Sequence, residues 1–460
     1  MPRRQSFDTR VPTVLVRLDR NPFHHGTLGA ARSLGRAGIP VHAVIESSTS
    51  PVARSRYLRS VRARPATSSS VELVALLTTI ADEIGGLGGL SDLGDPGDRT
   101  HPGEPGGTTA DAPSHPVLVL PLDDISALAL ARRRAELSPR FLLPEQTEEQ
   151  LLRVADKAAL ARTCAALGLP HPRTELPTCA DEAAAMAWAV GLPVVAKWSR
   201  PWLLQAGRGL RSTSIVRSLA EVRELYARTP EAGSRLLLQE LLPAGRDLDW
   251  FFHGYVDSAG HCTAGATGRK ERSWPDGAGL TAVGRWTVNP AVDRTARELL
   301  DALGYRGVCD LDFRLDRSTG AYHLLDFNPR PGAQFRLFAD PDGLDVVRAM
   351  HLDLTGRPVP PHFPAYGRRF VVENYAALSL LTSPRRRYAA EPGTARRTEC
   401  AWFAADDPAP ALAMGRAWLT HLLRRAVGAL ARRLGTGRAP HPATLPAPSA
   451  RTPSDQLTQR

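Results

Sequence analysis

An α/β protein is predicted from three features of this 460-residue chain. Short apolar runs alternate with a helical pattern over the first 45 residues, which is the order of a βαβ unit. A later stretch alternates between acidic and apolar residues, which is the period of a half-buried strand. The length corresponds to two to four domains of about 100–200 residues each. We therefore expect a Rossmann-like N-terminal domain followed by an α+β part.

The first elements are expected within a domain over residues 1–125. In order, they are a strand over 13–18, a helix over 26–37, a strand over 39–45, a helix over 71–84, a strand over 117–120 and a helix over 125–135. Residues 85–116 are rich in Gly, Pro, Asp and Thr and show no periodicity. We interpret them as a flexible insertion.

A second domain is expected over residues 126–360. It begins with helices between 147 and 168, followed by a strand over 193–197. The linker 361–367 opens a C-terminal extension over 361–434, which contains a helix over 408–434. Residues 435–460 are rich in Pro, Ser and Thr, which is typical of a disordered tail.

Composition excludes several classes of protein. The chain has no run of about 18 apolar residues, so no membrane span is expected. No apolar segment follows the charged start, so no secretory signal is expected. The five cysteines form no CxxC pair, which argues against a disulfide framework or a structural zinc site. We expect a cytoplasmic protein.

The basic residues are almost all arginine. Lys+Arg is 58 against 47 acidic residues, and the only lysines are Lys157, Lys197 and Lys270. Positive charge favours anionic partners, but no aromatic residues interleave with it, so nucleic acid is not expected. Because Lys is a compact point charge whereas Arg is a planar fork, each lysine in such a chain is a candidate for a specific role.

Two common nucleotide-binding motifs, the dinucleotide fingerprint and the P-loop, are not found complete in this sequence. Gly26 and Gly29 resemble half of a dinucleotide fingerprint, but the third glycine is missing, so an ordinary strand-to-helix turn is favoured over an NAD site. No GxxxxGK[ST] motif occurs, which excludes a P-loop.

The most informative stretch is an acidic hairpin over residues 308–328. Its first strand places Asp310, Asp312 and Arg314 on one face and Leu311, Phe313 and Leu315 on the other. Residues 316–320 have turn composition, and a second strand follows over 321–327. A turn centred on Ser318 would set Asp310 opposite Asp326, with Asp312 diagonal to it and Asn328 on the same face.

Oxygen ligands gathered on one face predict a divalent cation. The carboxylates repel one another unless a cation lies among them, and hard oxygen donors suit Mg²⁺ or Mn²⁺. Prolines 329 and 331 end the strand and hold Arg330 beside this face, where it can bind phosphate. The alternative is an exposed polar face with Asp310 paired to Arg314. Whether Asp310 joins the metal site stays open.

Over about residues 13–355 these motifs resemble the ATP-grasp superfamily, particularly its D-aspartate ligase-like carboxylate–amine ligases. The resemblance implies a two-subdomain ATP-grasp fold and a magnesium site formed by Asp312, Asp326 and Asn328. Asp326 stands where the family more often has Glu.

The resemblance also implies an ATP site that uses all three lysines. Lys157 and Lys197 would contact phosphates, Lys270 and Arg269 would meet the γ-phosphate together with Arg330, and Gly207 and Gly209 would close over the phosphates. The adenine would bind at a hinge near 239–245, along Gln239, Glu240, Leu241 and Leu242. Asp247 or Asp249 would hold the ribose, and this choice stays open.

The implied reaction joins a carboxylate to an amine through an acyl phosphate and releases ADP and phosphate. The alternatives are another ATP-grasp chemistry, namely carboxylation or phosphorylation of a small molecule, or nucleotide binding without turnover. Amino acids are candidate substrates, with specificity expected from residues 21–29, 123–124 and 274–285. A homodimer stays open. For the basic C-terminal helix, packing on the catalytic body is favoured over contact with a membrane surface.

Overall fold

The computed structural model describes residues 6–67, 69–91, 116–205, 208–275, 279–382 and 397–433. The chain divides into two compact units, residues 1–415 and 416–460. All three β-sheets lie in the first unit. The second unit holds most of helix α13 (Ala409–Arg433). The predicted domain boundaries near residues 125, 360 and 434 stay predictions.

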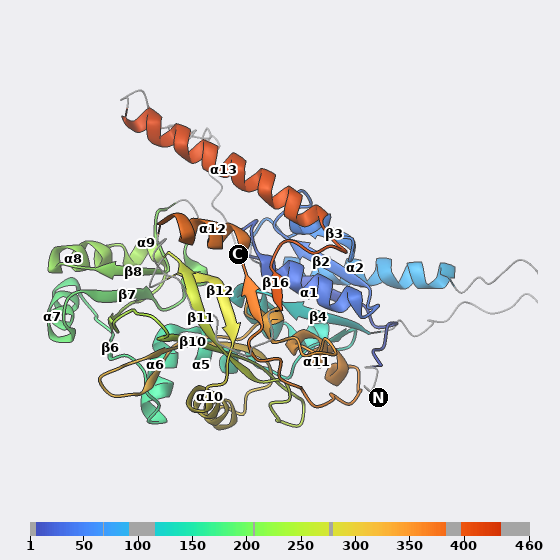
Figure 1. Ribbon diagram of the computed structural model, residues 1–460, viewed down its shortest axis with the longest axis horizontal. Helices are drawn as coiled ribbons and strands as arrows, with labels where there is room; N and C mark the ends of the chain where they lie inside the picture. The colour runs from blue at the N-terminus through green and yellow to red at the C-terminus, as the bar shows by residue number, and fades with distance from the viewer. Residues whose placement is uncertain are drawn as a thin grey trace, which may run out of the picture. The chain divides into compact units, whose positions relative to one another are not determined.

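The first sheet is parallel and has the strand order β3-β2-β1-β4-β5 (Figure 1). Its strands are β1 (Thr13–Val16), β2 (Val41–Ile45), β3 (Leu58–Ala63), β4 (Val117–Pro121) and β5 (Phe141–Leu142). Its helices are α1 (His25–Arg36), α2 (Ser70–Ser91), α3 (Asp124–Arg132) and α4 (Arg134–Leu137). The central strands are fully buried, as parallel strands covered on both faces must be. The predicted α/β class is confirmed. Residues 85–91, which we expected in the insertion, continue helix α2 instead, and residues 92–115 lie outside the described residues.

Gly26 has a packing role at the start of α1. A Cβ atom there would come within 2.9 Å of the Ala333 Cα atom. The glycine therefore allows α1 to approach the segment that follows the acidic hairpin, which favours the structural interpretation of this glycine pair.

The second sheet is antiparallel and has the order β6-β9-β7-β8. Its strands are β6 (Thr174–Glu175), β7 (Val194–Trp198), β8 (Thr213–Val216) and β9 (Leu236–Glu240). Helices α5 (Glu148–Ala155) and α6 (Lys157–Ala166) precede it, and α7 (Ala180–Val190), α8 (Leu219–Ala227) and α9 (Thr229–Ala232) follow its strands. Apolar residues of α7 and α8 share one buried cluster with β7 and β9.

The third sheet has the order β14-β13-β10-β11-β12-β15-β16, and every pairing except β15–β16 is antiparallel. Its strands are β10 (Asp249–Val256), β11 (Ala266–Trp274), β12 (Leu280–Trp286), β13 (Gly307–Leu315), β14 (Tyr322–Asn328), β15 (Arg369–Val371) and β16 (Thr398–Cys400). Helices α10 (Pro290–Ala302), α11 (Val346–Leu354) and α12 (Glu373–Thr382) accompany it, and the 3-10 turn η3 (Phe335–Phe338) follows β14.

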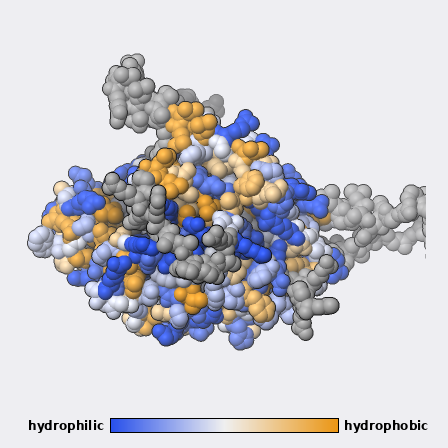
Figure 2. Space-filling model, viewed as in Figure 1, coloured by the Kyte–Doolittle hydropathy of each residue, from blue (hydrophilic) through white to orange (hydrophobic). Residues whose placement is uncertain are grey.

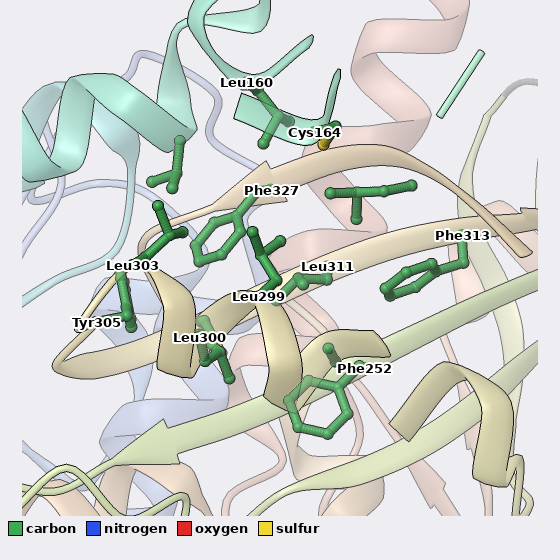
Figure 3. Packing of buried hydrophobic residues seen from close by; sticks show 14 of the residues in the cluster. Leu160, Cys164, Phe252, Leu299, Leu300, Leu303, Tyr305, Leu311, Phe313 and Phe327 are labelled. Carbon is green, nitrogen blue, oxygen red and sulfur yellow. The ribbon is translucent and has the colours of Figure 1, made fainter. Parts of the chain in front are cut away.

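The apolar face of the predicted hairpin lies in the core. Figure 3 shows Leu311 and Phe327 near Leu299 and Leu300 of α10, with Phe313 further along β13, and all five are at most 2% exposed. Leu160 and Cys164 of α6 belong to the same cluster. This burial confirms the predicted alternation of β13, because even-numbered residues must then point to the opposite face of the sheet.

The predicted register of the hairpin is wrong. Asp312 pairs with Asp326 and Asp310 pairs with Asn328, whereas we expected Asp310 opposite Asp326. Two shifts of one residue each account for the difference: the turn sets Leu315 opposite Tyr322 rather than Ala321, and a β-bulge at Leu325 adds one residue to β14 between the pairs Phe313–Leu324 and Asp312–Asp326. The bulge reverses the alternation, so that Leu324 and Phe327 both face the core although one is even-numbered and the other odd-numbered.

Helix α13 carries exposed apolar side chains. Leu412 is 70% exposed, and Leu419 and Leu423 are each 57% exposed. Figure 2 shows apolar residues on the coloured part of this helix. Across the described ranges, the helices are too short or too polar to cross a bilayer. All five cysteines are free thiols.

Candidate functional site

The N-cap residue of α6 links Lys157, the first residue of this helix, to the end of β7. Asp156 caps α6 by accepting hydrogen bonds from the backbone N–H groups of Ala158 and Ala159 at 3.0 and 3.1 Å. The same carboxylate accepts from the Ser199 hydroxyl and from Arg200 Nε, just beyond β7. Lys157 itself donates its backbone N–H to the Ser199 carbonyl at 2.8 Å. The α6 N-terminus and the end of β7 therefore form one unit.

All three lysines of the chain converge on the acidic hairpin. Lys157 Nζ forms an ion pair with Asp326, and Lys270 Nζ lies 2.8 Å from Asp312 Oδ1. Lys197 Nζ donates to the carbonyl oxygen of Leu325 at 3.0 Å. That carbonyl belongs to the bulge residue, whose backbone is not held by the regular ladder. The lysines come from α6, β7 and β11, so three separate segments deliver one ammonium group each.

Burial and neighbouring charges shift the pKa values of this cluster. Burial lowers the pKa of Lys197 to about 8, with Asp326 opposing the change and Lys157 adding to it. Burial raises the pKa of Asp312, and the carboxylates of Asp310 and Asp326 raise it further while Lys270 opposes them. The cluster therefore holds carboxylates close to one another and lysine ammonium groups close to one another. Such an arrangement is typical of sites that bind a cation and an anion together.

A buried chain of polar contacts lies behind Arg330. Arg330 Nη1 donates to Asp310 Oδ2 at 3.0 Å, and its Nε lies 3.7 Å from Asp124 Oδ1. His253 Nε2 lies 3.0 Å from the other Asp310 oxygen and has no exposed surface. Burial opposes ionisation of Asp310, but His253 and Arg330 hold its pKa below the ordinary value. Asp310 therefore supports Arg330, and the alternative pairing of Asp310 with Arg314 is not observed.

Gly332 closes this chain of contacts. A Cβ atom there would lie 2.3 Å from His253 Cε1 and 2.7 Å from Asp310 Cγ. Since real side chains never approach so closely, only glycine lets the turn after Arg330 lie on the His253–Asp310 pair.

Arg269 does not join the three lysines. Its neighbour Lys270 faces Asp312, and alternation along β11 points Arg269 to the other face of the sheet. There its guanidinium lies over the Trp250 ring and 3.3 Å from Asp247 Oδ1. The structure thus corrects the expectation that Arg269 and Lys270 act side by side.

The segment after β9 joins the second sheet to the third. β9 ends at Glu240, and residues 241–248 lead to β10. Arg314 donates to Asp249 Oδ1 at 2.7 Å and to the Leu242 carbonyl at 3.1 Å, which ties this connection to β13. Asp247 has a left-handed backbone with φ of 63°, which is uncommon for a residue other than glycine.

The predicted adenine and glycine segments are only partly constrained by contacts. Gln239 donates to Thr174 Oγ1, and the Glu240 backbone N–H donates to the Arg173 carbonyl at 2.9 Å. Leu241 is half-buried and Leu242 is buried. Gly209 is exposed and has φ of +71°, whereas Gly207 lies outside the described residues.

The predicted magnesium ligands fit a hard cation by their chemistry and position. Asp312 and Asp326 are register partners, and Asn328 lies one step further along the same face of β14. Their oxygens suit such a cation, and both carboxylates are balanced by lysines in this structure. Within the described ranges, no three His, Cys, Asp or Glu side chains are grouped to hold a metal ion.

Two supporting residues were not predicted. His253 lies in β10, whose mostly apolar and aromatic sequence has no strict alternation to mark it as a half-buried strand. Asp156 directly precedes Lys157 in the sequence. An acidic residue directly before an apolar helical run is a helix N-cap signal, so Asp156 could have been recognised.

Comparison with known proteins adds the following. No family model matches the chain. The chain is 24% identical over 216 residues to the N-terminal section of the carbamoyl phosphate synthase large chain from Methanopyrus kandleri. The matched region covers 44% of this chain and 36% of that protein. The chain thus spans about a third of the curated relative it matches.

Two solved structures share the arrangement of elements. The biotin carboxylase domain of 2-oxoglutarate carboxylase from Hydrogenobacter thermophilus, in complex with MgADP, ADP and bicarbonate, has a TM-score of 0.53 at 16% identity, covering 76% of this chain and 71% of that one. N5-carboxyaminoimidazole ribonucleotide synthetase from Thermus thermophilus has a TM-score of 0.51 at 15% identity, covering 76% and 80%. The chain has the ATP-grasp fold, as predicted.

Proposed function

We propose that this chain is an ATP- and magnesium-dependent ligase that joins a carboxylate to an amine through an acyl phosphate, with release of ADP and phosphate. The observation that carries the proposal is the convergence of Lys157, Lys197 and Lys270 on one acidic hairpin. The chain has 58 basic residues and only three lysines. Lysines scattered at random over the surface would not all lie at one place.

The residues around the hairpin divide into a metal side and a phosphate side. Asp312, Asp326 and Asn328 would hold Mg²⁺ or Mn²⁺, which supplies charge neutralisation for the phosphates when bound. Lys157 and Lys197 would then release their present partners and contact phosphate oxygens. Lys270 and Arg330 would stabilise the charge on the transferring γ-phosphoryl group. Arg269 is assigned to the nucleotide rather than to this group, because its partner is Asp247.

The nucleoside would lie along the connection between the second and third sheets. Backbone groups of residues 239–242 would meet the adenine, and Gly209 with Gly207 would close over the phosphates. Asp249 is already held by Arg314 at 2.7 Å, whereas Asp247 lies at the bend beside Arg269 and is 36% exposed. We therefore assign the ribose hydroxyls to Asp247.

Positioning and electrostatics account for the chemistry. The substrate carboxylate attacks the γ-phosphorus, ADP leaves, and the resulting acyl phosphate is attacked by the amine, which releases phosphate and forms an amide. Arg330 stands where it can stabilise the anionic groups, because Asp310 and Asp124 hold it and His253 in turn holds Asp310. No covalent intermediate on a protein side chain is needed.

A second candidate has bicarbonate as the acid. Both solved structures described above carry names of carboxylation enzymes, and one of them contains bicarbonate. With bicarbonate, the same phosphoryl transfer would give a carboxyphosphate, and the amine would receive a carboxyl group. The two candidates use the same ATP and metal residues and differ only in the acid.

Isotope transfer tests the proposal directly. Purified protein is incubated with Mg-ATP and a panel of amines, each with an ¹⁸O-labelled amino acid or with ¹⁸O-labelled bicarbonate. An acyl phosphate transfers one carboxylate oxygen to the released phosphate, so ¹⁸O-phosphate together with ADP and an amide product supports the ligase. Label from bicarbonate alone supports the second candidate.

The Asp326→Ala variant is the matched control for that assay. It should abolish ADP release while leaving the secondary structure unchanged, because Asp326 lies on the polar face of the hairpin. Formation of ADP without ¹⁸O-phosphate would overturn the acyl-phosphate mechanism. Binding of Mg-ATP without ADP release for any pair would overturn the enzymatic proposal.

A further inference from the structure

A second charged cavity lies apart from the hairpin. It has a volume of about 680 Å³, within the range of small-molecule sites in proteins. Its walls come from α1, from residues 336 and 368, and from residues 397–406. The lining residues are Arg32, Arg36, Arg336, Arg368, Arg397, Thr398, Glu399, Cys400, Phe403, Ala404, Ala405 and Asp406. None of them belongs to the hairpin or to the three lysine-bearing segments.

The cavity lies along α1 away from the proposed active site. His24 precedes α1 and lies close to Arg330. Burial is the main cause that holds the pKa of His24 below its ordinary value, and the Arg330 guanidinium lowers it further. Arg36 is in the last turn of the same helix, about 16 Å further along its axis at 1.5 Å per residue. A ligand in the cavity would therefore not occupy the phosphate site.

Positive charge exceeds negative charge in the cavity wall. Five arginines line it with two carboxylates, Glu399 and Asp406, while Asp345 and Asp407 stand behind them. Glu399 is shared between two guanidinium groups, Arg336 and Arg368. Arg32 donates hydrogen bonds to Asp407 and to the carbonyl groups of residues 401 and 402. Arg336 is also paired with Asp345 and Arg36 with Asp406, so each of these four arginines has a carboxylate partner and Arg397 is the fifth.

Arg397 carries the charge that is not balanced. Among the described residues, Arg397 has no ion pair or side-chain hydrogen bond, and it is exposed at the cavity. Burial lowers the pKa of Arg368 in spite of Glu399, and the neighbouring Arg336 lowers it further. Planar guanidinium groups bind carboxylate and phosphate oxygens in a bidentate manner, so such a set is suited to an anion with more than one charged group.

We propose that this cavity binds a small polyanion, that is, a molecule with at least two carboxylate or phosphate groups. Arg397, Arg36 and the Arg336–Glu399–Arg368 group all line the site. Phe403 is 56% exposed at the cavity and offers an apolar surface to the remainder of the ligand. The proposal is independent of the ligase function, because no residue of the ATP site is used.

Calorimetric titration of the full-length protein with pyrophosphate and, separately, with citrate tests this site. The two probes distinguish a phosphate ligand from a carboxylate ligand. We expect binding of at least one of them, weakened at least tenfold in both Arg397→Gln and Arg36→Gln. Circular dichroism checks that each variant is folded, and Asp406 keeps the Tyr57 hydroxyl as a partner when Arg36 is replaced.

Two further variants locate the binding. Arg223→Gln removes a half-exposed arginine on α8, and its affinity should equal that of the unchanged protein. Lys270→Ala disables the phosphate side of the hairpin, and it should leave the affinity for citrate unchanged. The proposal is overturned if neither probe releases heat, if either arginine variant of the cavity binds normally, or if Lys270→Ala abolishes the binding.

Discussion

The two faces of the β13–β14 hairpin have the same backbone but opposite chemistry. One face carries Leu311, Phe313 and Phe327, which are at most 1% exposed and pack on α10 and α6. The other carries Asp310, Asp312 and Asp326, each beside a cationic or imidazole group. The apolar face stabilises the fold, and this stability lets the acidic face hold charges close together. Substitutions on the apolar face should therefore change the free energy of unfolding, whereas substitutions on the acidic face should change the turnover of ATP.

The largest effect is expected on the apolar face. Phe313→Ala should lower the free energy of unfolding by about 3–5 kcal/mol, because a fully buried ring is replaced by a cavity. Urea denaturation followed by circular dichroism measures this change. Leu280→Ala, at a side chain that is 60% exposed, is the control and should change stability little. Equal losses in the two variants would contradict the difference between core and surface.

On the acidic face the corresponding effect should be on turnover. Asp326→Asn keeps the shape of the side chain but removes a charge from the metal side. We expect ATP turnover to fall at least about 100-fold, equal to about 2.7 kcal/mol of transition-state stabilisation, with a nearly unchanged unfolding midpoint. Steady-state ADP release provides the measurement. Asp316→Asn, in the turn of the same hairpin, should keep full activity, and loss of activity there would refute the assignment.

A smaller effect is expected behind Arg330. His253→Phe keeps an aromatic ring among Phe251 and Phe338 but removes the nitrogen that lies 3.0 Å from Asp310. Because Asp310 supports Arg330, we expect kcat to fall about tenfold, while KM for ATP stays constant. A rise in KM with constant kcat would place His253 in nucleotide binding instead.

The smallest effect is a pH dependence that arises from Lys197. Its pKa is lowered to about 8, so the ammonium group loses its proton in the folded protein as pH rises through 8. Affinity for Mg-ADP should therefore decrease several-fold between pH 7 and pH 9.5, as measured by calorimetry. Lys197→Arg should flatten this dependence, because a guanidinium stays charged throughout. An identical pH profile in the variant would remove Lys197 from the phosphate site.

The same shift has a defined consequence for stability. Between about pH 8 and the unfolded value near 10.5, the unfolded chain binds more protons at Lys197 than the folded chain does. The contribution of Lys197 to the free energy of unfolding therefore rises with pH in this window. Thermal unfolding at pH 7.5 and 9.5 should show this trend, and Lys197→Met should lack it.

Much of the site could be predicted because its sequence signals are local. Strict alternation in residues 308–315 identified the strand and its two faces, and the scarcity of lysine identified Lys157, Lys197 and Lys270. What could not be predicted depends on tertiary structure. His253 lies in the mostly apolar and aromatic strand β10, and its pairing with Asp310 requires β10 to lie beside β13. The bulge was missed because Leu325 is an ordinary strand residue, and pairing alone reveals the extra position.

The bulge at Leu325 also provides a backbone carbonyl that a regular ladder would lack. Removal of this one codon would restore an uninterrupted ladder between Leu324 and Asp326. Asp326 would stay opposite Asp312 and Phe327 opposite Leu311, but the carbonyl that receives Lys197 would disappear. Homologues that keep this contact should therefore tolerate many substitutions at position 325, because its backbone makes the contact, but not a deletion.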